Sequence, residues 1–512
     1  MGRNSLGRLL PETFAGRPVQ PYRSPFERLP EGEHASRPLR RHNPGEDKQL
    51  DSLRTAIEAA GLRDGMCIAT HHHLRNGDAL LNSVVRELDG MGLRDIRIAS
   101  SSIHPVHTEL IPYIEKGVIS AFECGVNGPI GEMISRGELD CPVIVRTHGG
   151  RARAVIAGEV RVDAAFIAAP CCDRYGNMNG YYGPSACGSL GYAHTDAGYA
   201  KHVIAVTDNL CDAPITPVSI PQSQVDHVVK VQTLGDPRKI VSTTTRITRD
   251  PVGLQIARYA ARVIEASGLL CDGFSFQTGA GGISLAVAEQ VRRMMTERQI
   301  KGSFGCGGIT GYFVDMLEEG LFRSLFDVQC FDLRAVQSIG SNLQHQEMSA
   351  DTYANPFNAG AMVNLLDCVI LGATEVDVDF NVNVNTESNG YLLHNTGGHS
   401  DAAAGAKLSI ITAPLLRGRL PIIKDAVTTV TTPGRTVDVI VTERGIAVND
   451  HQQELKKELL RCKVPVMDIR ELQQEACRMT GVPRPLEFTD EVVALIEYRD
   501  GTIIDAVYRV KE

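Results

Sequence analysis

Side chains that could do acid–base or nucleophilic chemistry gather in the segment NTESNGYLLHNTGGHSD, which follows an alternating apolar pattern typical of a strand. Polar groups at this density cost free energy to bury unless they bind something. Glu387 could act as a base or a nucleophile, and Asn389 and His399 could contact a substrate. The paired Gly397 and Gly398 would let a ligand approach the backbone closely. The plainer interpretation is a solvated loop with helix-capping residues.

A second candidate is the glycine-rich turn FQTGAGG, which places Gly279, Gly281 and Gly282 between a predicted buried strand and a predicted helix. Such a turn presents backbone N–H groups at a helix N-terminus, where they can bind phosphate or stabilise an oxyanion. Gly281 and Gly282 are therefore candidate catalytic residues. A tight turn that binds no ligand is at least as common for this pattern.

The segment THHHLRNGD also follows a predicted buried strand. Three consecutive histidines cannot all point the same way, so the run is a poor chelator and predicts no metal site. His72, His73 and Arg75 could instead meet the carboxylates of a small acid, because a guanidinium grips a carboxylate with two hydrogen bonds. Helix capping alone also explains the run from Asn76 to Asp78.

The elements that must position these residues alternate between strand and helix patterns from Gln49 onward, which predicts mostly parallel sheets with both faces covered. Residues 102–120 and 307–325 read as imperfect copies of one another, each with a small-residue turn that leads into a helix pattern. Two distant copies suggest two related α/β halves rather than a solenoid. The cleft between such halves is the expected place for chemistry.

Length and the polar stretch 234–250 set the expected organisation. A chain of 512 residues exceeds what one core usually organises. We expect an extended arm over residues 1–47, a first α/β domain over 48–238 and a second over 239–512. The arm could be a disordered tail or a strap that wraps a partner subunit.

Composition excludes several classes of function. A formal charge of −9 argues against nucleic-acid binding. The 13 cysteines show neither paired zinc-ligand spacing nor a disulfide framework, which favours free thiols in a reducing compartment. No apolar stretch is long enough to span a membrane, and the start of the sequence lacks the apolar core of a signal peptide. A cytoplasmic protein that binds neither nucleic acid nor membrane is expected.

Five motifs in order, THHHLRNGD, VDAAFIAAPCCDRYGNMNG, FQTGAGG, GGITGYFVDMLEEG and NTESNGYLLHNTGGHSD, resemble the citrate lyase α-subunit family of the coenzyme A transferase superfamily. The resemblance implies two related transferase-type α/β domains with the active site in the cleft between them. It further implies that acetyl is exchanged for citryl on an acyl-carrier thioester, which releases acetate.

The same resemblance implies partners rather than a cofactor on this chain. The thioester would be carried by a CoA-like prosthetic group on a separate γ (acyl carrier) subunit, and a β (lyase) subunit would cleave the citryl product. A homo-oligomer within a larger complex is expected. Contacts to the carrier group would come from the glycines of both glycine-rich motifs, which are Gly279, Gly281, Gly397 and Gly398.

One departure from related transferases affects the expected mechanism. Acetate and 4-hydroxybutyrate CoA-transferases carry a nucleophilic glutamate in a His-Thr-Glu segment, where this sequence reads Ile309, Thr310, Gly311, Tyr312. The first copy keeps the motif at 107–109, but in the half that does not ordinarily supply the nucleophile. We therefore expect a carboxylate of citrate to attack the thioester directly and give a mixed anhydride, with Glu387 as the alternative nucleophile.

Other functions stay open at this point. An acyl-CoA hydrolase or a ping-pong acetate CoA-transferase would keep the fold and change the acceptor. A noncatalytic scaffold for an acyl carrier and a lyase subunit would need no chemistry in the loop 387–401. A protein similar to sugar-phosphate isomerases is conceivable on fold analogy alone.

Overall fold

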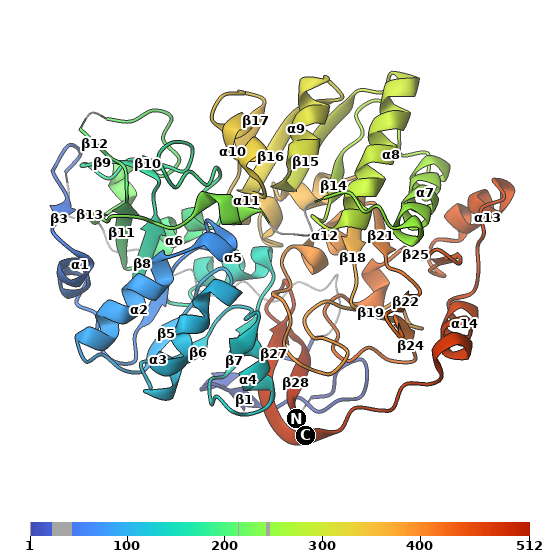
Figure 1. Ribbon diagram of the computed structural model, residues 1–512, viewed down its shortest axis with the longest axis horizontal. Helices are drawn as coiled ribbons and strands as arrows, with labels where there is room; N and C mark the ends of the chain where they lie inside the picture. Colours follow the sequence, from blue (N-terminus) through green and yellow to red (C-terminus); the bar gives the residue numbers. More distant parts are fainter. Residues whose placement is uncertain (1, 23–42, 213, 242–245, 512) are drawn as a thin grey trace.

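Two α/β halves lie side by side in the computed structural model, which describes residues 2–22, 43–212, 214–241 and 246–511 (Figure 1). Each half is built around a mostly parallel sheet. Strand β8 (Ala164–Ala168) shows why both faces of the first sheet are covered, since all five of its side chains are buried and alternate ones belong to two different core clusters. The expected fold class is confirmed.

The first sheet has ten strands, and all its pairings are parallel except that of its last two strands. In spatial order the strands are β28 (Ile503–Val510), β27 (Phe488–Glu497), β7 (Val143–Val145), β6 (Ile119–Phe122), β5 (Ile96–Ile98), β4 (Cys67–Ala69), β8, β11 (His202–Thr207), β13 (His227–Lys230) and β3 (Gln49–Leu50).

The second sheet has eight strands. They are β17 (His345–Glu347), β16 (Phe322–Cys330), β15 (Gly302–Ile309), β14 (Phe276–Thr278), β18 (Cys368–Gly372), β21 (Leu408–Thr412), β25 (Val439–Val441) and β26 (Ile446–Val448). Seven of them, from β17 to β25, repeat the order of the seven strands from β7 to β13 in the first sheet. In each sheet four successive strands, β4 to β7 and β14 to β17, add in one direction, and the next strand joins the other side of the first of these four, so β14 corresponds to β4 and β18 to β8. The copies at 102–120 and 307–325 lie at equivalent places, between β5 and β6 and between β15 and β16. The duplication that the sequence predicts is therefore present in the fold.

Helices connect these strands, and local signals explain their ends. Asp250 accepts a hydrogen bond from the Gly253 N–H and Pro251 occupies the first turn of α7, while Asp468 and Glu471 form a capping box on α14. The helices are α1 (Leu53–Ala59), α2 (Leu80–Gly90), α3 (Ile111–Glu115), α4 (Pro129–Ser135), α5 (His148–Ile156), α6 (Ala193–Tyr199), α7 (Pro251–Ala266), α8 (Gly282–Arg298), α9 (Gly311–Glu318), α10 (Leu333–Ile339), α11 (Ala350–Ala354), α12 (His399–Gly405), α13 (Gln453–Arg461) and α14 (Ile469–Thr480).

Short strands outside the two main sheets form small sheets of two or three strands. They are β1 (Thr13–Phe14) with β2 (Arg17–Pro18), β9 (Cys171–Asp173) with β10 (Met178–Asn179) and β12 (Leu210–Cys211), β19 (Glu375–Asp377) with β20 (Val382–Asn383) and β24 (Ile423–Lys424), and β22 (Leu416–Arg417) with β23 (Leu420–Pro421). No helix in the described ranges has the length and apolar character that crossing a bilayer requires.

The C-terminal hairpin differs from the expected division of the chain. We expected 239–512 to form the second domain, but β27 pairs in parallel with β7, so the hairpin β27–β28 extends the first sheet (Figure 1). The physical reason is the apolar run from Val493 to Ile496, which is buried against the first half's core. The boundary near residue 238 stays a prediction.

Residues 2–22 of the predicted arm pack on this hairpin. Leu10 is fully buried in a small cluster with Leu495, Ile503 and Ala506. Arg8 forms a 2.6 Å ion pair with the buried Asp505, and the Tyr22 N–H donates to the Ile503 carbonyl. This part of the arm therefore packs against its own chain. The remainder, 23–42, lies outside the described residues, and a contact with a partner subunit stays a prediction.

Candidate active site

The histidine run and the glycine-rich turn occupy equivalent places in the two halves. His71–His73 follow β4, and Gly279–Gly282 follow β14, which are the corresponding central strands. At each of these strands the order of the sheet reverses, and the carboxyl ends of strands at such a point commonly bind ligands in open parallel sheets. The topology thus favours both loops as parts of one site.

His72 connects the two halves. Its backbone N–H donates to the Ser101 hydroxyl at 3.0 Å, and its Nδ1 lies 2.5 Å from the same oxygen. Its Nε2 lies 2.9 Å from Gln329 Oε1, and Gln329 Nε2 donates to the His72 carbonyl at 2.9 Å. Because Gln329 presents its oxygen to the ring, Nε2 carries the proton and Nδ1 accepts from Ser101.

Three further rings surround His72. The ring centroids of His104 and Tyr192 lie 5.3 Å and 4.9 Å from that of His72. His148 stacks 6.1 Å from His72 and lies 4.5 Å from Tyr192. His104, His148 and Tyr192 lie at or just before the starts of helices of the first half. With His72 and with Gln329 from β16 they form a ring cluster at the boundary between the halves.

The histidines of this ring cluster are neutral. Burial lowers the pKa of His72 well below its usual value, and it lowers the pKa of His104 and of His148 to about 3. Neutral imidazoles offer one donor and one acceptor each. Both nitrogens of His72 are already engaged by Ser101 and Gln329, so a hydrogen bond to a polar substrate would come from His104, whose buried Nε2 has no hydrogen-bond partner among the described residues, and it would add no charge.

The positive charge at this place comes from Arg75. Its guanidinium lies 4.9 Å from the Phe331 ring centroid, and Nη1 donates to the Ile240 carbonyl at 3.3 Å. Burial lowers its pKa from the usual value, and its charge contributes to the lowered pKa of His72 and His104. Across the ranges 2–22, 43–212, 214–241 and 246–511, no carboxylate forms an ion pair with it.

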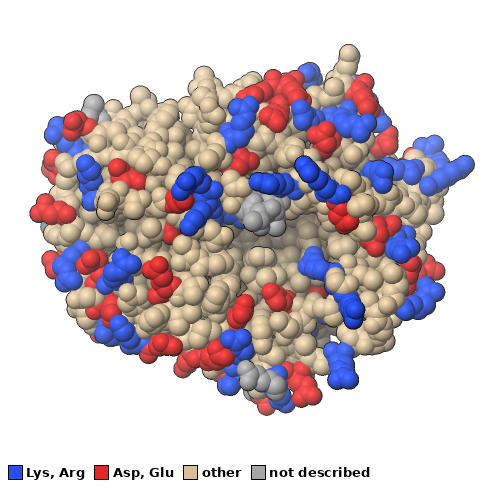
Figure 2. Space-filling view, viewed as in Figure 1, with Lys and Arg blue, Asp and Glu red and all other residues tan. Residues whose placement is uncertain are grey.

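A half-buried guanidinium that has no acidic partner in the described part of the chain, beside neutral donor and acceptor rings, suits a small carboxylate or another anion. Figure 2 shows a hollow between the two halves with Lys and Arg side chains along its upper edge. The structure therefore brings two of the predicted substrate-binding residues, His72 and Arg75, to one place.

The glycine-rich turn of the second half is open to solvent on one side. Gly281 is the N-cap of the 17-residue helix α8, and a Cβ added there would meet no atom within 4 Å. The Gly279 N–H is taken by the Ile370 carbonyl. A Cβ on Gly282 would lie 2.8 Å from the Arg246 carbonyl oxygen, so close backbone packing explains that glycine. Binding of an anion at Gly281 stays a prediction.

The second glycine pair contacts protein groups. The Gly397 carbonyl accepts from the His148 N–H at 2.9 Å. A Cβ on Gly398 would lie 2.2 Å from the Tyr353 hydroxyl oxygen, and this hydroxyl accepts from Gln277 Nε2 at 2.8 Å. Both glycines therefore lie beside the ring cluster, but Gly398 makes room for Tyr353 and leaves none there for a ligand.

His73 and His399 have structural surroundings rather than a place in the cleft. The His73 side chain is fully buried, with Nδ1 3.5 Å from Asp78. His399 uses both ring nitrogens, at 2.7 Å from the Thr432 hydroxyl and 2.8 Å from the Gly372 carbonyl. Neither nitrogen of His399 is left for a substrate, so the expectation of substrate contact does not hold in this geometry.

Glu387 and Asn389 lie on an exposed turn that points elsewhere. The Glu387 N–H donates to the Tyr391 carbonyl, and Gly390 packs on Phe488 of the C-terminal hairpin. Asn389 lines a groove of about 680 Å³ together with residues 420–428 and 482–488. Because a tight turn reverses the chain between 387 and 391, these side chains leave the cleft before the segment returns to it at Gly397. No contact joins Glu387 to the ring cluster.

Neither copy of the repeat supplies a free carboxylate near the cluster. In the second copy the Gly311 N–H donates to Asp332 Oδ2 at 2.7 Å, and the other carboxylate oxygen accepts from the Ala335 N–H and caps α10. In the first copy His107 binds Asp78 at 3.0 Å, and Glu109 is exposed beside Arg86. The carboxylate nearest to Gly311 is therefore engaged in capping.

Sequence reasoning missed His104, His148, Tyr192 and Gln329. A signal for three of them was present, because His104 and His148 follow β5 and β7 and Gln329 lies near the end of β16. Carboxyl ends of parallel strands meet at the same edge of a sheet. Polar residues just after each predicted strand could therefore have been grouped. Tyr192 does not follow a strand of the main sheet directly, so this grouping would not have found it.

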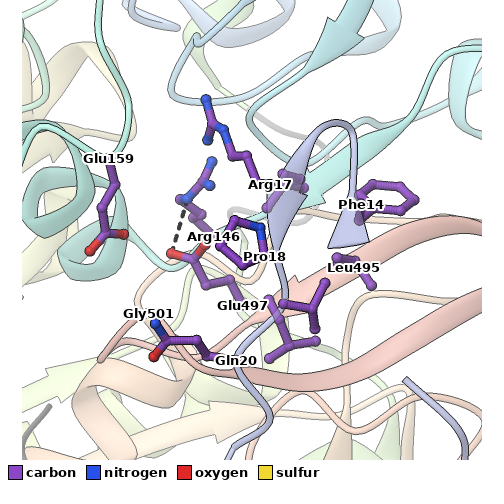
Figure 3. A pocket seen from close by; sticks show the side chains of 12 residues that line it. Phe14, Arg17, Pro18, Gln20, Arg146, Glu159, Leu495, Glu497 and Gly501 are labelled. Carbon is purple, nitrogen blue, oxygen red and sulfur yellow. Dashed lines mark hydrogen bonds and ion pairs between the residues drawn. The ribbon is translucent and has the colours of Figure 1, made fainter. Parts of the chain in front are cut away.

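A separate cavity of about 330 Å³ lies between the arm and the first sheet (Figure 3). Its wall includes Arg17 from the arm and Arg146, whose Nε lies 3.0 Å from Glu497. Arg146 and Arg17 also pair with the buried Glu123. Each charged residue that lines this cavity forms an ion pair, either with another lining residue or with the neighbouring Glu123 or Arg153, which makes the cavity part of an internal ionic network rather than of the ring cluster.

Comparison with known proteins assigns the chain to a family. A model of the family described as citrate lyase, alpha subunit (CitF), matches residues 46–510. The chain belongs to the citrate lyase α-subunit family. Citrate lyase alpha chains from Klebsiella pneumoniae and Haemophilus influenzae are 50% and 44% identical, over 91% and 96% of this chain and 92% and 97% of theirs. As a member of this family, the protein is an enzyme of the transferase class.

Solved structures support the same assignment. A crystal structure from Streptococcus mutans, described as the α subunit of citrate lyase in complex with citrate, superposes with a TM-score of 0.95 at 45% identity and covers both chains fully. The α subunit of a malonate decarboxylase from Acinetobacter baumannii is 17% identical, with a TM-score of 0.61 over 84% of this chain and 89% of that one, which shows a shared fold. The expected membership of the citrate lyase α-subunit family is confirmed.

Proposed function

We propose that the protein exchanges acetyl for citryl on an acyl-carrier thioester, so that acetyl-carrier and citrate give citryl-carrier and acetate. The observation that carries the proposal is Arg75, a half-buried cation without an acidic partner in the described parts of the chain, placed beside the neutral rings of His72 and His104. Citrate carries carboxylates for the guanidinium and a hydroxyl for the unpartnered Nε2 of His104. The S. mutans relative, whose structure contains citrate, supports this choice of acid.

The transfer is proposed to proceed through a mixed anhydride. A carboxylate oxygen of citrate attacks the acetyl carbonyl, the C–S bond breaks, and the carrier leaves as a thiolate. The thiolate then attacks the citryl carbonyl of the anhydride, the C–O bond to acetate breaks, and acetate departs. Atoms and charge balance without water or an external base. Supporting this route, the Gly311 position has no side chain, and the nearby Asp332 carboxylate is held by two backbone N–H groups.

Two features of the chain would lower the barrier. Backbone N–H groups at the start of α8, near Gly281 and Gly282, would stabilise the oxyanions that form in both steps. Holding the acid and the thioester in one cleft would supply acceleration through orientation. The CoA-like group belongs to the separate acyl carrier (γ) subunit, and the citryl product would pass to a β (lyase) subunit, with no cofactor resident on this chain.

Assembly and location complete the proposal. A homo-oligomer within a citrate lyase complex would bring the carrier to each cleft. A cytoplasmic location fits the cysteines, all 13 of which are free.

The test is exchange of labelled acetate into acetyl-carrier, measured with and without citrate on the reconstituted complex. Arg75→Gln is expected to raise KM for citrate about 100-fold, which corresponds to about 2.7 kcal/mol. Arg258→Gln, an exposed arginine on α7, is the control and should leave KM unchanged. Unaltered citrate affinity in Arg75→Gln would contradict the proposed site.

A second experiment separates the routes. The enzyme is loaded with acetyl donor, treated with borohydride and examined by mass spectrometry. The anhydride route leaves no reduced glutamate, whereas a modified Glu387 would establish a glutamyl thioester and overturn it. Thioester hydrolysis in the absence of citrate would instead favour the acyl-CoA hydrolase. Full exchange by a variant that lacks the ring cluster would favour the noncatalytic scaffold.

A further inference from the structure

Three consecutive residues at the start of α5 are hydrogen-bonded to the start of α12 and the residue just before its N-cap, in the opposite half. The Thr147 hydroxyl donates to Asp401 Oδ1 at 2.9 Å, the His148 N–H donates to the Gly397 carbonyl at 2.9 Å, and the Gly149 N–H donates to Asp401 Oδ2 at 3.0 Å. Asp401 therefore binds on both sides of His148. Both residues that donate to Asp401 precede it by more than 250 positions in the sequence.

The Asp401 carboxylate lies at the N-terminus of helix α5 and accepts a hydrogen bond there. The first N–H groups of a helix lack partners within the helix, and a negative charge there is favourable. The Thr147 side chain already caps α5 by accepting from the Gly150 N–H at 2.7 Å. Asp401 adds a second acceptor from the other half of the molecule, so α5 is capped in part by a residue outside its own half.

The surroundings leave this contact little freedom. Asp401 is fully buried, and a Cβ on Gly149 would lie 2.0 Å from the Ala354 carbonyl oxygen of α11. Arg499 approaches Asp401 at 3.6 Å and donates to the same Ala354 carbonyl. The start of α5 is thus clamped between α11, α12 and the C-terminal hairpin, with Asp401 at the centre.

Resting on the proposed function, we propose that Asp401 is a positioning residue, which fixes the backbone at His148 from the opposite half and so sets the ring of His148 against His72 and Tyr192. The His148 ring centroid lies 4.5 Å from that of Tyr192, and a Cβ added at Gly397 would lie 3.7 Å from His148 Nε2. A displacement of about 1 Å at such a ring can cost about 100-fold in rate. Asp401 is fully buried and acts through protein groups, namely Thr147, Gly149 and Arg499.

The test compares Asp401→Ala, which removes both acceptors, with Asp401→Asn, which keeps one oxygen for the Gly149 N–H. The matched control is Asp438→Ala, because Asp438 is also buried, accepts from the Ser409 N–H at 2.7 Å and lies away from the ring cluster. We expect Asp401→Ala to lower kcat for acetate exchange at least 10-fold with less than a threefold change in KM for citrate. Asp401→Asn should recover part of the loss, and Asp438→Ala should keep kcat within twofold.

A second readout does not depend on the proposed reaction. Histidines are labelled at Cε1 with ¹³C, and His148→Gln identifies the His148 resonance. This resonance is expected to shift or broaden in Asp401→Ala and to stay in place in Asp438→Ala. If wild-type protein shows no exchange at all, the proposed function fails while this measurement still tests the positioning role.

An unchanged His148 resonance in Asp401→Ala, together with kcat within twofold of wild type, would overturn the proposal, and so would a loss of thermal stability alone. Should Asp401→Ala fail to fold, Asp401→Asn is measured against Asp438→Asn by the same two readouts. An equal effect of those two variants on kcat would also overturn it.

Discussion

Gln329 and His72 exchange two hydrogen bonds between the halves of the molecule, since the glutamine oxygen faces the ring Nε2 at 2.9 Å and its amide donates to the His72 carbonyl at 2.9 Å. The pair fixes both the orientation and the tautomer of the imidazole. The orientation of one imidazole in the first half is thus fixed by a residue of the second half.

Gln329→Met keeps the volume and removes both hydrogen bonds. A buried donor and acceptor on His72 then lack partners, so we expect a loss of about 1–3 kcal/mol in the free energy of unfolding and a fall in kcat. Urea unfolding and acetate exchange measure the two effects. Gln346→Met on the exposed side of β17 is the control and should change stability by less than about 0.5 kcal/mol.

Arg75→Lys tests whether the shape of the guanidinium matters as well as its charge. Lysine keeps the charge but cannot present two parallel N–H groups to a carboxylate. We expect a rise in KM for citrate of about 10-fold, or about 1.4 kcal/mol, between wild type and Arg75→Gln. Equal KM values for Arg75→Lys and wild type in citrate-dependent exchange would show that charge alone suffices.

Acid should destabilise the protein through its buried histidines. Burial lowers the pKa of His71 and of His104 to about 3, below the ordinary 6.5 of an unfolded chain. Between these values the unfolded chain binds more protons, so the free energy of unfolding rises with pH and falls as pH drops below 6.5. At pH 5 each ring accounts for about 2 kcal/mol of that loss.

Asp401 acts in the opposite direction over part of the same range, because burial raises its pKa to about 6 and the folded protein takes up a proton there. Urea unfolding at pH 7.5, 6 and 5 measures the sum. His104→Gln should reduce the slope with pH, and an unchanged slope would contradict a neutral, buried His104.

Gly398→Ala should disturb the cleft through a steric clash. The new Cβ would lie 2.2 Å from the Tyr353 hydroxyl oxygen, so Tyr353 must move and its hydrogen bond from Gln277 weakens. We expect a loss of about 1–3 kcal/mol in stability by thermal or urea unfolding. Gly372→Ala is the control, since its Cβ meets no atom within 4 Å.

The ionic network beneath the arm should depend more on Glu123 than on Arg17. Glu123 is buried and pairs with Arg17, Arg97 and Arg146, while Arg17 is partly exposed. Glu123→Gln leaves the buried Arg146 with fewer negative partners, and we expect a loss of about 3–5 kcal/mol. Arg17→Met should cost less. Urea unfolding decides, and a larger effect of Arg17→Met would contradict the buried network.

Much of the architecture could be predicted from local patterns. Alternating strand and helix signals gave the parallel sheets, and the two copies at 102–120 and 307–325 gave the duplicated halves, because both depend on short-range periodicity. The pairing of β27 with β7 could not be predicted, since nearly 350 residues separate them. An apolar run shows that a strand is buried but not which sheet receives it.

The site was predictable only in part for the same reason. His72 and Arg75 directly follow a central strand, and their place follows from sheet topology. Glu387 and His399 lie in one polar segment, yet a tight turn leaves the first exposed on the surface, and hydrogen bonds to Thr432 and Gly372 engage the second. Local composition shows neither the direction of a turn nor the remote partners of a ring.

The hairpin β27–β28 also sets an order of events during synthesis. Its residues leave the ribosome after the whole second half, so until then β7 presents an unpaired edge. A polypeptide terminated before Phe488 would retain that edge, and we expect it to self-associate or to require a chaperone. Maturation of the first half thus waits for translation of the second.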